Sequence, residues 1–171
     1  MFITLRPELP KDAPQIRKVN QKAFGQRTEA AIVDVLRERC HDSISFVATT
    51  DNRIVGHILF TPVMIQQGVK EIRGMGLAPM AVLPEYQRQG IGSAMVKTGI
   101  DALRKASCPF VVVLGHPEYY PRFGFVPAAR HGIRCQWEGV PDEAFMAIII
   151  DAPTMEGVSG VARYRAEFDQ N

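Results

Sequence analysis

Hydrophobic and polar positions follow regular periods along the first part of the chain. Residues 2–6 (FITLR) alternate and predict a first strand. Apolar residues then recur at helical spacing in two segments, which predict one helix from Asp12, its expected capping residue, to about Ala23, and a second from Thr28 to Cys40. The chain is therefore expected to begin with one strand and two amphipathic helices.

The central part reads as strands around one helix. The β-rich runs SISFVATT and IVGHILFTPVMI flank the polar segment DNR, and this pattern predicts a hairpin. Residues 72–83 predict a further strand, and an amphipathic helix of about four turns is expected over residues 93–106, ahead of Pro109. The continuous apolar run at residues 110–115 (FVVVLG) is typical of a central strand buried on both faces.

A strand, a helix and a buried strand in this order predict a crossover that joins a parallel pair. Shorter strands are expected in FGFVP, GIRCQW and EAFMAIIID, and the C-terminal stretch is ambiguous. Because hairpins flank the crossover, we expect a mixed α/β layer, α+β in character, rather than a doubly wound sheet. No linker divides the chain, so a single domain over residues 1–171 is predicted.

Composition narrows the class of protein. Hydrophobic residues make up 46% and charged residues 22%, as in globular proteins, and the net charge of +2 is too small to favour nucleic acid as a partner. No apolar run is long enough to span a bilayer and no secretion signal is visible, so no membrane partner is expected. The three cysteines, Cys40, Cys108 and Cys135, fit a reducing cytoplasm better than a disulfide framework.

Two glycines, Gly90 and Gly92, lie at the expected mouth of the central helix, in EYQRQGIGSAMV. The first N–H groups of a helix lack acceptors within the helix and attract anions, and glycine lets a phosphate approach the backbone. The first turn offers Arg88 and Ser93 and no acidic residue. The segment therefore predicts an anion site, and a turn that needs glycine for its geometry alone is the alternative.

Other phosphate, metal and nucleophile motifs are excluded by the sequence. No GxxxxGK[ST] occurs, and Gly90-Ile-Gly92 has Met95 where a dinucleotide fingerprint requires a third glycine or alanine. The four histidines show no metal spacing, and no GxSxG elbow is present. No metal site is predicted.

Two segments carry a resemblance to a known family. MAVLPEYQRQGIGSAMV resembles the acyl-CoA-binding segment of the GNAT superfamily of N-acetyltransferases, in which [Q/R]-x-x-G-x-[G/A] opens a helix, and YYPRFGF resembles the later Y-x-x-x-G-F signature of that family. GHPEYYPRFGF further resembles a subgroup of small bacterial predicted acetyltransferases. The matching positions are Gln87, Gly90 and Gly92 in the first segment and Tyr120, Gly124 and Phe125 in the second.

The resemblance implies a GNAT-like acyl-CoA N-acyltransferase fold. Its central mixed sheet would have a splayed parallel strand pair and helices on both faces, and Pro79 agrees with an interrupted ladder there. It also implies acetyl-CoA as co-substrate, with acetyl transfer to a primary amine by direct attack and without a metal. The acceptor, a small molecule or a protein amine, is not identified, and a homodimer is compatible with the family.

The resemblance assigns the cofactor site residue by residue. Backbone N–H groups of residues 88–93 would hold the pyrophosphate of CoA, and the strand end at Ala81 and Val82 would pair with the pantetheine arm. A backbone N–H near Val82 would meet the oxyanion. The predicted CoA-binding residues are Ala81, Val82, Gln87, Arg88, Gln89, Gly90, Ile91, Gly92 and Ser93.

Tyr120 matches the family's general-acid tyrosine by its spacing to Gly124. A phenol has a pKa near 10 and a thiol near 8.5, so tyrosine can protonate the departing thiolate. A packing role for Tyr120 is the alternative, and Tyr119 takes the acid role if the turn is shifted by one residue. The family often has an asparagine near the end of the preceding strand, and VVVLGHPE has none.

The general base and the acceptor pocket are left open. His116 could accept the amine proton or orient a water, or it could simply hydrogen-bond the following turn. Glu29 opens the second predicted helix and could hold the amine, or it could be an ordinary carboxylate favoured by the helix dipole. A catalytically silent CoA-binding sensor or regulatory module is the alternative function.

Overall fold

The computed structural model describes residues 2–169, which form two compact units. Unit 1 comprises the chain up to Phe60, then Ala78–Asp101 and the segment from Ala166 onward. Unit 2 comprises Thr61–Leu77 and Ala102–Arg165. The hydrogen-bonded strands are, in order, β1 (Thr4–Pro7), β2 (Ile44–Thr50), β3 (Arg53–Gln67), β4 (Lys70–Val82), β5 (Phe110–Leu114), β8 (Phe145–Ile149) and β6 (Val126–Pro127). Strands β3 and β4 each run through both units. The prediction of a single domain over residues 1–171 stays a prediction.

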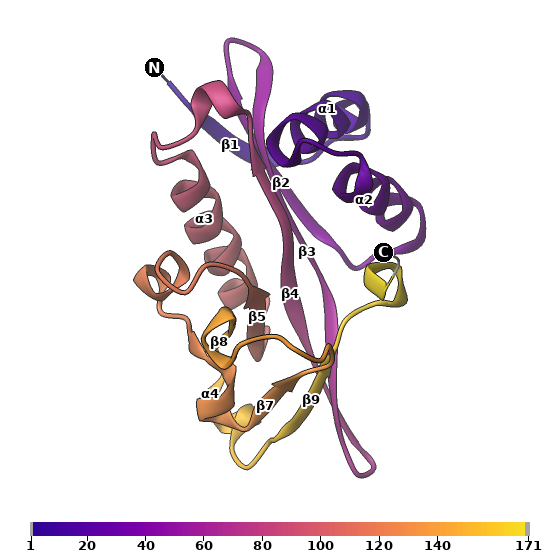
Figure 1. Ribbon diagram of the computed structural model, residues 1–171, viewed down its shortest axis with the longest axis vertical. Helices are drawn as coiled ribbons and strands as arrows, with labels where there is room; N and C mark the ends of the chain where they lie inside the picture. Colours follow the sequence, from indigo (N-terminus) through magenta and orange to yellow (C-terminus); the bar gives the residue numbers. More distant parts are fainter. Residues whose placement is uncertain (1, 170–171) are drawn as a thin grey trace. The chain divides into compact units, whose positions relative to one another are not determined.

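Unit 1 begins with an antiparallel arrangement of β1 (Thr4–Pro7), β2 (Ile44–Thr50) and β3 (Arg53–Gln67) (Figure 1). The turn between β2 and β3 has two residues with positive φ, Asp51 at 50° and Asn52 at 61°. Asp and Asn tolerate this conformation, which matches the twist of the adjoining strands. The hairpin predicted around DNR is confirmed, and Asp51 and Asn52 allow the tight turn that joins its two strands.

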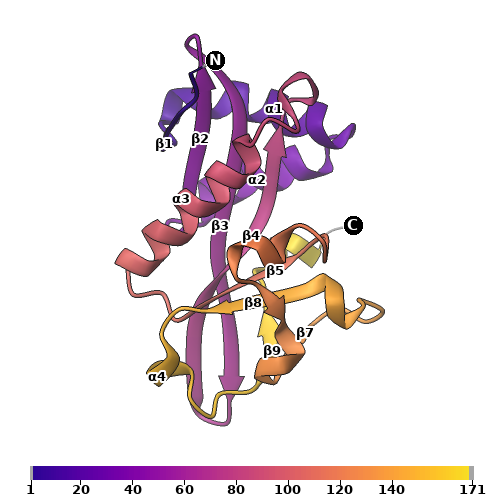
Figure 2. The same cartoon turned by 90° about the vertical axis from the view of Figure 1, so that its left-hand side faces the viewer.

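Helices cover both faces of the sheet in unit 1. The helices α1 (Ala13–Phe24) and α2 (Thr28–Arg39) lie on one face and α3 (Ile91–Lys105) on the other (Figures 1 and 2). Neighbouring residues of β3 show the alternation: the His57 ring contacts Asn20 of α1, whereas a Cβ at Gly56 would lie 3.1 Å from the Met95 side chain of α3. Helices on both faces, as predicted, are confirmed.

Asp12 directly precedes α1, as predicted for its capping residue, but its side chain makes no capping hydrogen bond to this helix. Residues Pro10–Asp12 form a 3-10 turn ahead of the helix. The Asp12 carboxylate accepts hydrogen bonds from the Arg6 guanidinium at 2.7 and 3.0 Å and from the Leu9 N–H at 2.7 Å. Hydrogen bonding to Arg6, the largest cause, holds the pKa of this buried carboxyl below its usual value. A partner six residues away replaces the predicted local cap.

Unit 2 holds the parallel pair. Within it, β4 pairs with β5 in parallel from Met75–Val111 to Leu77–Val113, and β5, β8 and β6 follow in antiparallel order. β7 and β9 pair in parallel, and β9 also pairs with β3. The elements are β4 (Lys70–Val82), β5 (Phe110–Leu114), β6 (Val126–Pro127), β7 (Ile133–Cys135), β8 (Phe145–Ile149), β9 (Gly160–Arg163) and a short helix, α4 (Ala152–Met155).

The predicted crossover is confirmed, and its parallel ladder is short. Residues Phe110–Val113 of β5 are fully buried, as a central strand requires, and Leu114 at its end is 44% exposed. The ladder between β4 and β5 covers three residues on each strand, while β4 continues to Val82. The mixed α/β fold class expected from the sequence is therefore the observed one.

Gly99→Ala is expected to lower the free energy of unfolding by about 1–3 kcal/mol, because α3 rests on β3 without room for a methyl group. A Cβ at Gly99 would lie 2.3 Å from Cε2 of the fully buried Phe60 ring. Urea denaturation measures the loss, and Lys97→Ala, on the exposed side of the same helix, is the control. Equal midpoints for Gly99→Ala and wild type would contradict this account of the packing.

Candidate active site

The end of β4 is held by hydrogen bonds on two sides. The Leu83 N–H donates to the Val55 carbonyl at 2.9 Å, and the Val82 carbonyl accepts from the Gln87 side-chain amide at 2.9 Å. The peptide between Val82 and Leu83 is thus bonded through both its N–H and its C=O. Ala81, just before it, is buried at 2% exposure. The strand that was predicted to pair with pantetheine ends in a fixed orientation.

The turn after β4 requires unusual backbone angles. A 3-10 turn over Pro84–Tyr86 leads to Arg88 at a φ of 62° and Gly90 at 85°. A Cβ at Gly90 would meet nothing within 4 Å, so backbone conformation rather than crowding requires glycine there. The positive φ thus accounts for the glycine at position 90, and the anion site at this turn stays a prediction.

The mouth of α3 follows directly after Gly90. The first helical hydrogen bond runs from the Ala94 N–H to the Gly90 carbonyl at 3.0 Å. The N–H groups of Ile91 and Gly92 precede it and have no acceptor within the helix. No acidic residue stands in the first turn of α3. A helix N-terminus of this kind carries partial positive charge and suits a phosphate.

Tyr120 lies in a cluster of aromatic rings in unit 2. It begins the 3-10 turn Tyr120–Phe123 and is 7% exposed. Its ring makes edge-to-face contacts with Tyr119 at 5.0 Å and Phe125 at 5.7 Å between centroids. Gly124, at a φ of 100°, ends the turn with an N–H bond to the Pro121 carbonyl at 3.0 Å. Gly124 and Phe125, the glycine and the phenylalanine of the second sequence signature, therefore both help to position Tyr120.

The environment of Tyr120 keeps its hydroxyl protonated. Burial, and to a smaller extent the neighbouring Tyr119, raises the pKa of Tyr120 to about 12. A phenol with this pKa donates a hydrogen bond throughout the neutral range but gives up its proton less readily than a free phenol. The side chain is therefore suited to hydrogen-bonding a developing thiolate.

His116 and Glu29 have simpler surroundings. The His116 side chain is exposed, and its carbonyl accepts from the N–H groups of Tyr119 at 3.1 Å and Tyr120 at 3.4 Å. The half-buried Glu29 accepts from the Gln26 side-chain amide at 2.9 Å. His116 and Tyr120 belong to unit 2, whereas Glu29 and the predicted CoA-binding residues belong to unit 1. The roles predicted for His116 and Glu29 stay predictions.

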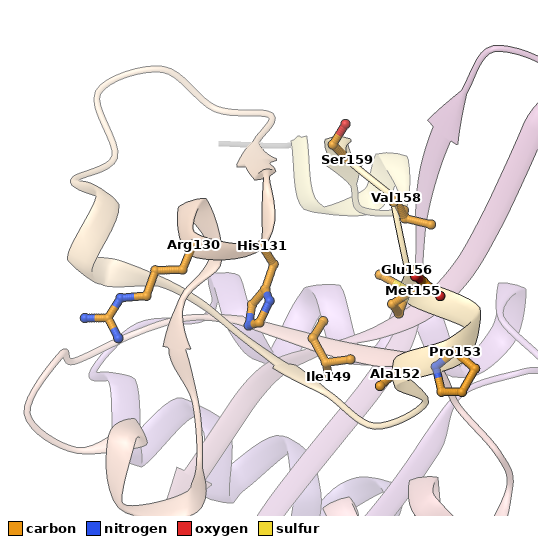
Figure 3. Close-up of a pocket in the computed structure, with 10 residues that line it drawn as sticks. Arg130, His131, Ile149, Ala152, Pro153, Met155, Glu156, Val158 and Ser159 are labelled. Carbon is orange, nitrogen blue, oxygen red and sulfur yellow. The ribbon is translucent and has the colours of Figure 1, made fainter.

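A hollow of about 860 Å³ in unit 2 contains none of the predicted site residues (Figure 3). The His131 ring points toward Ile149, another lining residue, while the Arg130 guanidinium points away from Ile149 (Figure 3). Met155 and Val158 add buried apolar side chains. The hollow offers one histidine and one carboxylate, Glu156, and lacks the tyrosine and the helix mouth that acetyl transfer from a thioester would use.

Residues 2–169 contain neither a candidate membrane span nor a candidate metal cluster. In this part of the chain no helix combines the length and the apolar character that crossing a membrane requires. Across the same residues, no three or more histidine, cysteine, aspartate or glutamate side chains gather in a way that could hold a metal ion.

Comparison with known proteins identifies the family. Residues 4–128 match the acetyltransferase (GNAT) domain family. The chain is 35% identical over 167 residues to the uncharacterized N-acetyltransferase YhbS of Escherichia coli K12, covering 97% of this chain and 98% of that protein. The match therefore extends beyond the two short signatures to nearly the whole length of both proteins.

Two solved structures share the fold at similar identity. The crystal structure of YhbS from Escherichia coli in complex with CoA gives a TM-score of 0.91 at 35% identity, over 98% of this chain and 92% of that one. A GNAT family acetyltransferase from Brucella melitensis in complex with acetyl-CoA gives 0.80 at 34% identity, over 98% and 99%. The predicted enzyme class is confirmed, and the chain belongs to the GNAT family of acetyltransferases.

Proposed function

We propose that this protein is an N-acetyltransferase that transfers the acetyl group of acetyl-CoA to a primary amine by direct attack. The observation that carries the proposal is the mouth of α3, where N–H groups without an acceptor inside the helix follow a strand whose last peptide is fixed. Relatives with 35% and 34% identity along nearly the whole chain were crystallised with CoA and acetyl-CoA. Residues 1–171 act as one catalytic domain in this proposal.

The cofactor binds along unit 1. Its diphosphate accepts hydrogen bonds from the N–H groups of Ile91 and Gly92, and Arg88 adds positive charge nearby. The pantetheine arm lies along the end of β4 at Ala81 and Val82, in the manner of an added strand. No acidic residue of the first helical turn opposes the diphosphate.

The chemistry proceeds in one displacement. The neutral amine attacks the thioester carbonyl, the new C–N bond forms, and the C–S bond breaks to release CoA. The Val82 N–H stabilises the oxyanion, and the Tyr120 hydroxyl hydrogen-bonds the leaving sulfur and gives it a proton, which water then returns to the phenolate. The proton lost from the amine passes to water, which the exposed His116 orients. The step requires no metal and no covalent intermediate on the protein.

A free-thiol assay tests the proposal. The protein is mixed with acetyl-CoA and a panel of primary amines, and thiol release is followed with and without each amine. Amine-dependent release supports acetyl transfer. Tight CoA binding by calorimetry with no release across small-molecule and peptide amines would instead favour the silent sensor, and no heat with CoA would overturn both.

Gln87→Met is expected to weaken CoA binding about fivefold, because it removes the hydrogen bond of 2.9 Å that fixes the Val82 carbonyl. Gln87→Arg keeps N–H donors and is expected to recover most of the affinity. Gln66→Met is the control, since Gln66 is exposed, lies outside the predicted CoA-binding residues and donates its amide to the Gly68 carbonyl at 3.5 Å. Calorimetry measures the CoA affinity of all three variants. Equal affinities for Gln87→Met and wild type would show that the hydrogen bond from Gln87 to the Val82 carbonyl does not support CoA binding.

A further inference from the structure

Gly115 follows directly after β5 and has no conformational reason to be glycine. Its N–H donates to the Ala144 carbonyl at 2.9 Å, which continues the ladder between β5 and the chain leading into β8. Its φ is not among the positive values found in the structure. Any L-residue could adopt this backbone, so the missing side chain must be explained by space.

The space is taken by the ring of Tyr120. A Cβ at Gly115 would lie 2.4 Å from Cε2, 2.9 Å from Cδ2 and 3.4 Å from Cζ of Tyr120. The first two distances are overlaps, so the ring rests directly on the glycine backbone. Phe125, 1% exposed, lies against Tyr120 at 5.7 Å, and Tyr119 at 5.0 Å. The Tyr120 ring is thus in contact with Phe125 and Tyr119 as well as with Gly115.

We infer that Gly115 is a positioning residue for acetyl transfer: its missing side chain sets how deep the Tyr120 ring lies and therefore where the hydroxyl points. The inference rests on the proposed function, which gives Tyr120 its role. Gly115 itself touches neither the thioester nor the amine in this account. Gly115 acts through the Tyr120 ring. The atoms nearest to its Cβ position belong to Tyr120 and not to Tyr119, so the effect concerns Tyr120 alone.

A methyl group at position 115 is expected to displace the Tyr120 hydroxyl. It pushes the Tyr120 ring away from the backbone, and the hydroxyl moves with the ring. A misplacement of about 1 Å can cost on the order of 100-fold in rate. Gly115→Ala is therefore expected to lower kcat about 10- to 100-fold, while the Kd for CoA stays within about twofold because the CoA-binding residues lie elsewhere in the chain.

A double-mutant cycle with Tyr120→Phe separates this role from a structural one. In the Phe background the ring is still displaced but there is no hydroxyl to misplace, so adding Gly115→Ala is expected to lower kcat by less than about twofold. Losses that multiply would show that Gly115 does not act through the hydroxyl and would overturn the inference. Tyr120→Phe with full activity would overturn it as well.

A glycine of the same unit provides the control for lost stability. A Cβ at Gly132 would lie 3.0 Å from the Ser159 Cβ, and its φ is 71°, so Gly132→Ala is also expected to destabilise the fold. Assayed well below both melting temperatures, Gly132→Ala should keep its kcat and Gly115→Ala should not. If Gly132→Ala loses as much activity, the effect is one of stability and the inference fails.

An independent readout follows the ring itself. With tyrosine labelled at the ring carbon that bears the hydroxyl, the NMR signal missing from Tyr120→Phe identifies Tyr120, and this signal is expected to shift in Gly115→Ala and not in Gly132→Ala. An unshifted signal overturns the inference even if activity falls. Failure of the wild type to release thiol from acetyl-CoA would instead be a failure of the proposed function, so the two are distinguished.

Discussion

Replacing Tyr120 by phenylalanine is expected to lower kcat for acetyl transfer about 100-fold while changing the Kd for CoA less than twofold. General acid catalysis by a positioned side chain typically contributes 100-fold or more, and the substitution removes only the hydroxyl. The aromatic contacts with Tyr119 and Phe125 are kept because the ring is kept. A loss confined to kcat identifies an interaction made in the transition state.

Tyr119→Phe is the matched control for this prediction. Tyr119 is half-buried, with the Arg122 guanidinium 4.7 Å from its ring, whereas Tyr120 is 7% exposed and rests on Gly115. Tyr119→Phe is expected to keep kcat within about threefold of wild type. The opposite order of effects would assign the acid role to Tyr119, as a turn shifted by one residue predicts.

The raised pKa of Tyr120 adds a pH signature. With a value of about 12, the free enzyme keeps this hydroxyl protonated up to about pH 11. The pH profile of kcat/KM reports the groups of the free enzyme. We therefore expect the wild type to show no alkaline loss near pH 10 that is absent from Tyr120→Phe. A wild-type profile that falls with an apparent pKa near 10, and a variant profile that does not, would contradict the buried, protonated state.

Local sequence patterns were sufficient for most of the fold. The β2–β3 hairpin follows from Asp51 and Asn52, because both the strand alternation and the turn conformation are decided by neighbouring residues. The parallel pair follows from the unbroken apolar run of β5, which only a doubly covered strand can bury. The mouth of α3 was also predicted, since an N-terminus without an acidic residue is visible in the sequence.

Contacts between distant residues could not be predicted in the same way. Asp12 bonds to Arg6 and Leu9 instead of capping α1, because a guanidinium is a stronger partner than a helix N–H group. Gly115 lies five residues before Tyr120. The two residues come into contact only because the intervening turn brings the Tyr120 ring onto the Gly115 backbone. Such a glycine has no motif, and only the folded chain shows that a Cβ at this position would overlap the ring.

A buried polar network in unit 1 also has no local pattern in the sequence that would predict it. His57, on β3, is fully buried, with Nδ1 3.2 Å from the Asn20 amide nitrogen and Nε2 3.1 Å from the Ser45 hydroxyl. Ser45 donates to Glu8 at 3.0 Å, and Glu8 accepts from Arg37 at 3.1 Å. The network joins β2, β3, α1 and α2, and His57 is its only titratable group without exposure.

The hydrogen bonds define a neutral imidazole. Asn20 donates its amide to the Ile16 carbonyl at 3.0 Å, so the same nitrogen donates to Nδ1 of His57, and Nε2–H then donates to Ser45. The Glu8 carboxylate, 3.8 Å from Nε2, would by itself favour a charged ring. Burial, the larger cause, and the Arg37 guanidinium oppose it and lower the pKa of His57 to about 3.

Unfolding is therefore expected to become easier as the pH falls below about 6.5, with His57 as a specific cause. Between about pH 6.5 and pH 3 the unfolded chain binds a proton on this histidine and the folded protein does not, so the free energy of unfolding falls by about 1.4 kcal/mol per pH unit. Above pH 6.5 both states leave the ring neutral and the contribution is constant.

His57→Gln isolates this contribution, because glutamine keeps a hydrogen-bonding side chain and cannot titrate. Between pH 6.5 and pH 5 the wild type is expected to lose about 2 kcal/mol more than the variant, measured by urea denaturation at each pH. His41→Gln, at an exposed histidine, should follow the wild type.

Should His57→Gln fail to fold, the NMR signals of the His57 ring protons in the wild type provide the test: their chemical shifts should stay constant from pH 7 to pH 4. Signals that titrate near pH 6.5, or parallel stability curves, would mean that the folded protein protonates His57 as readily as the unfolded chain does.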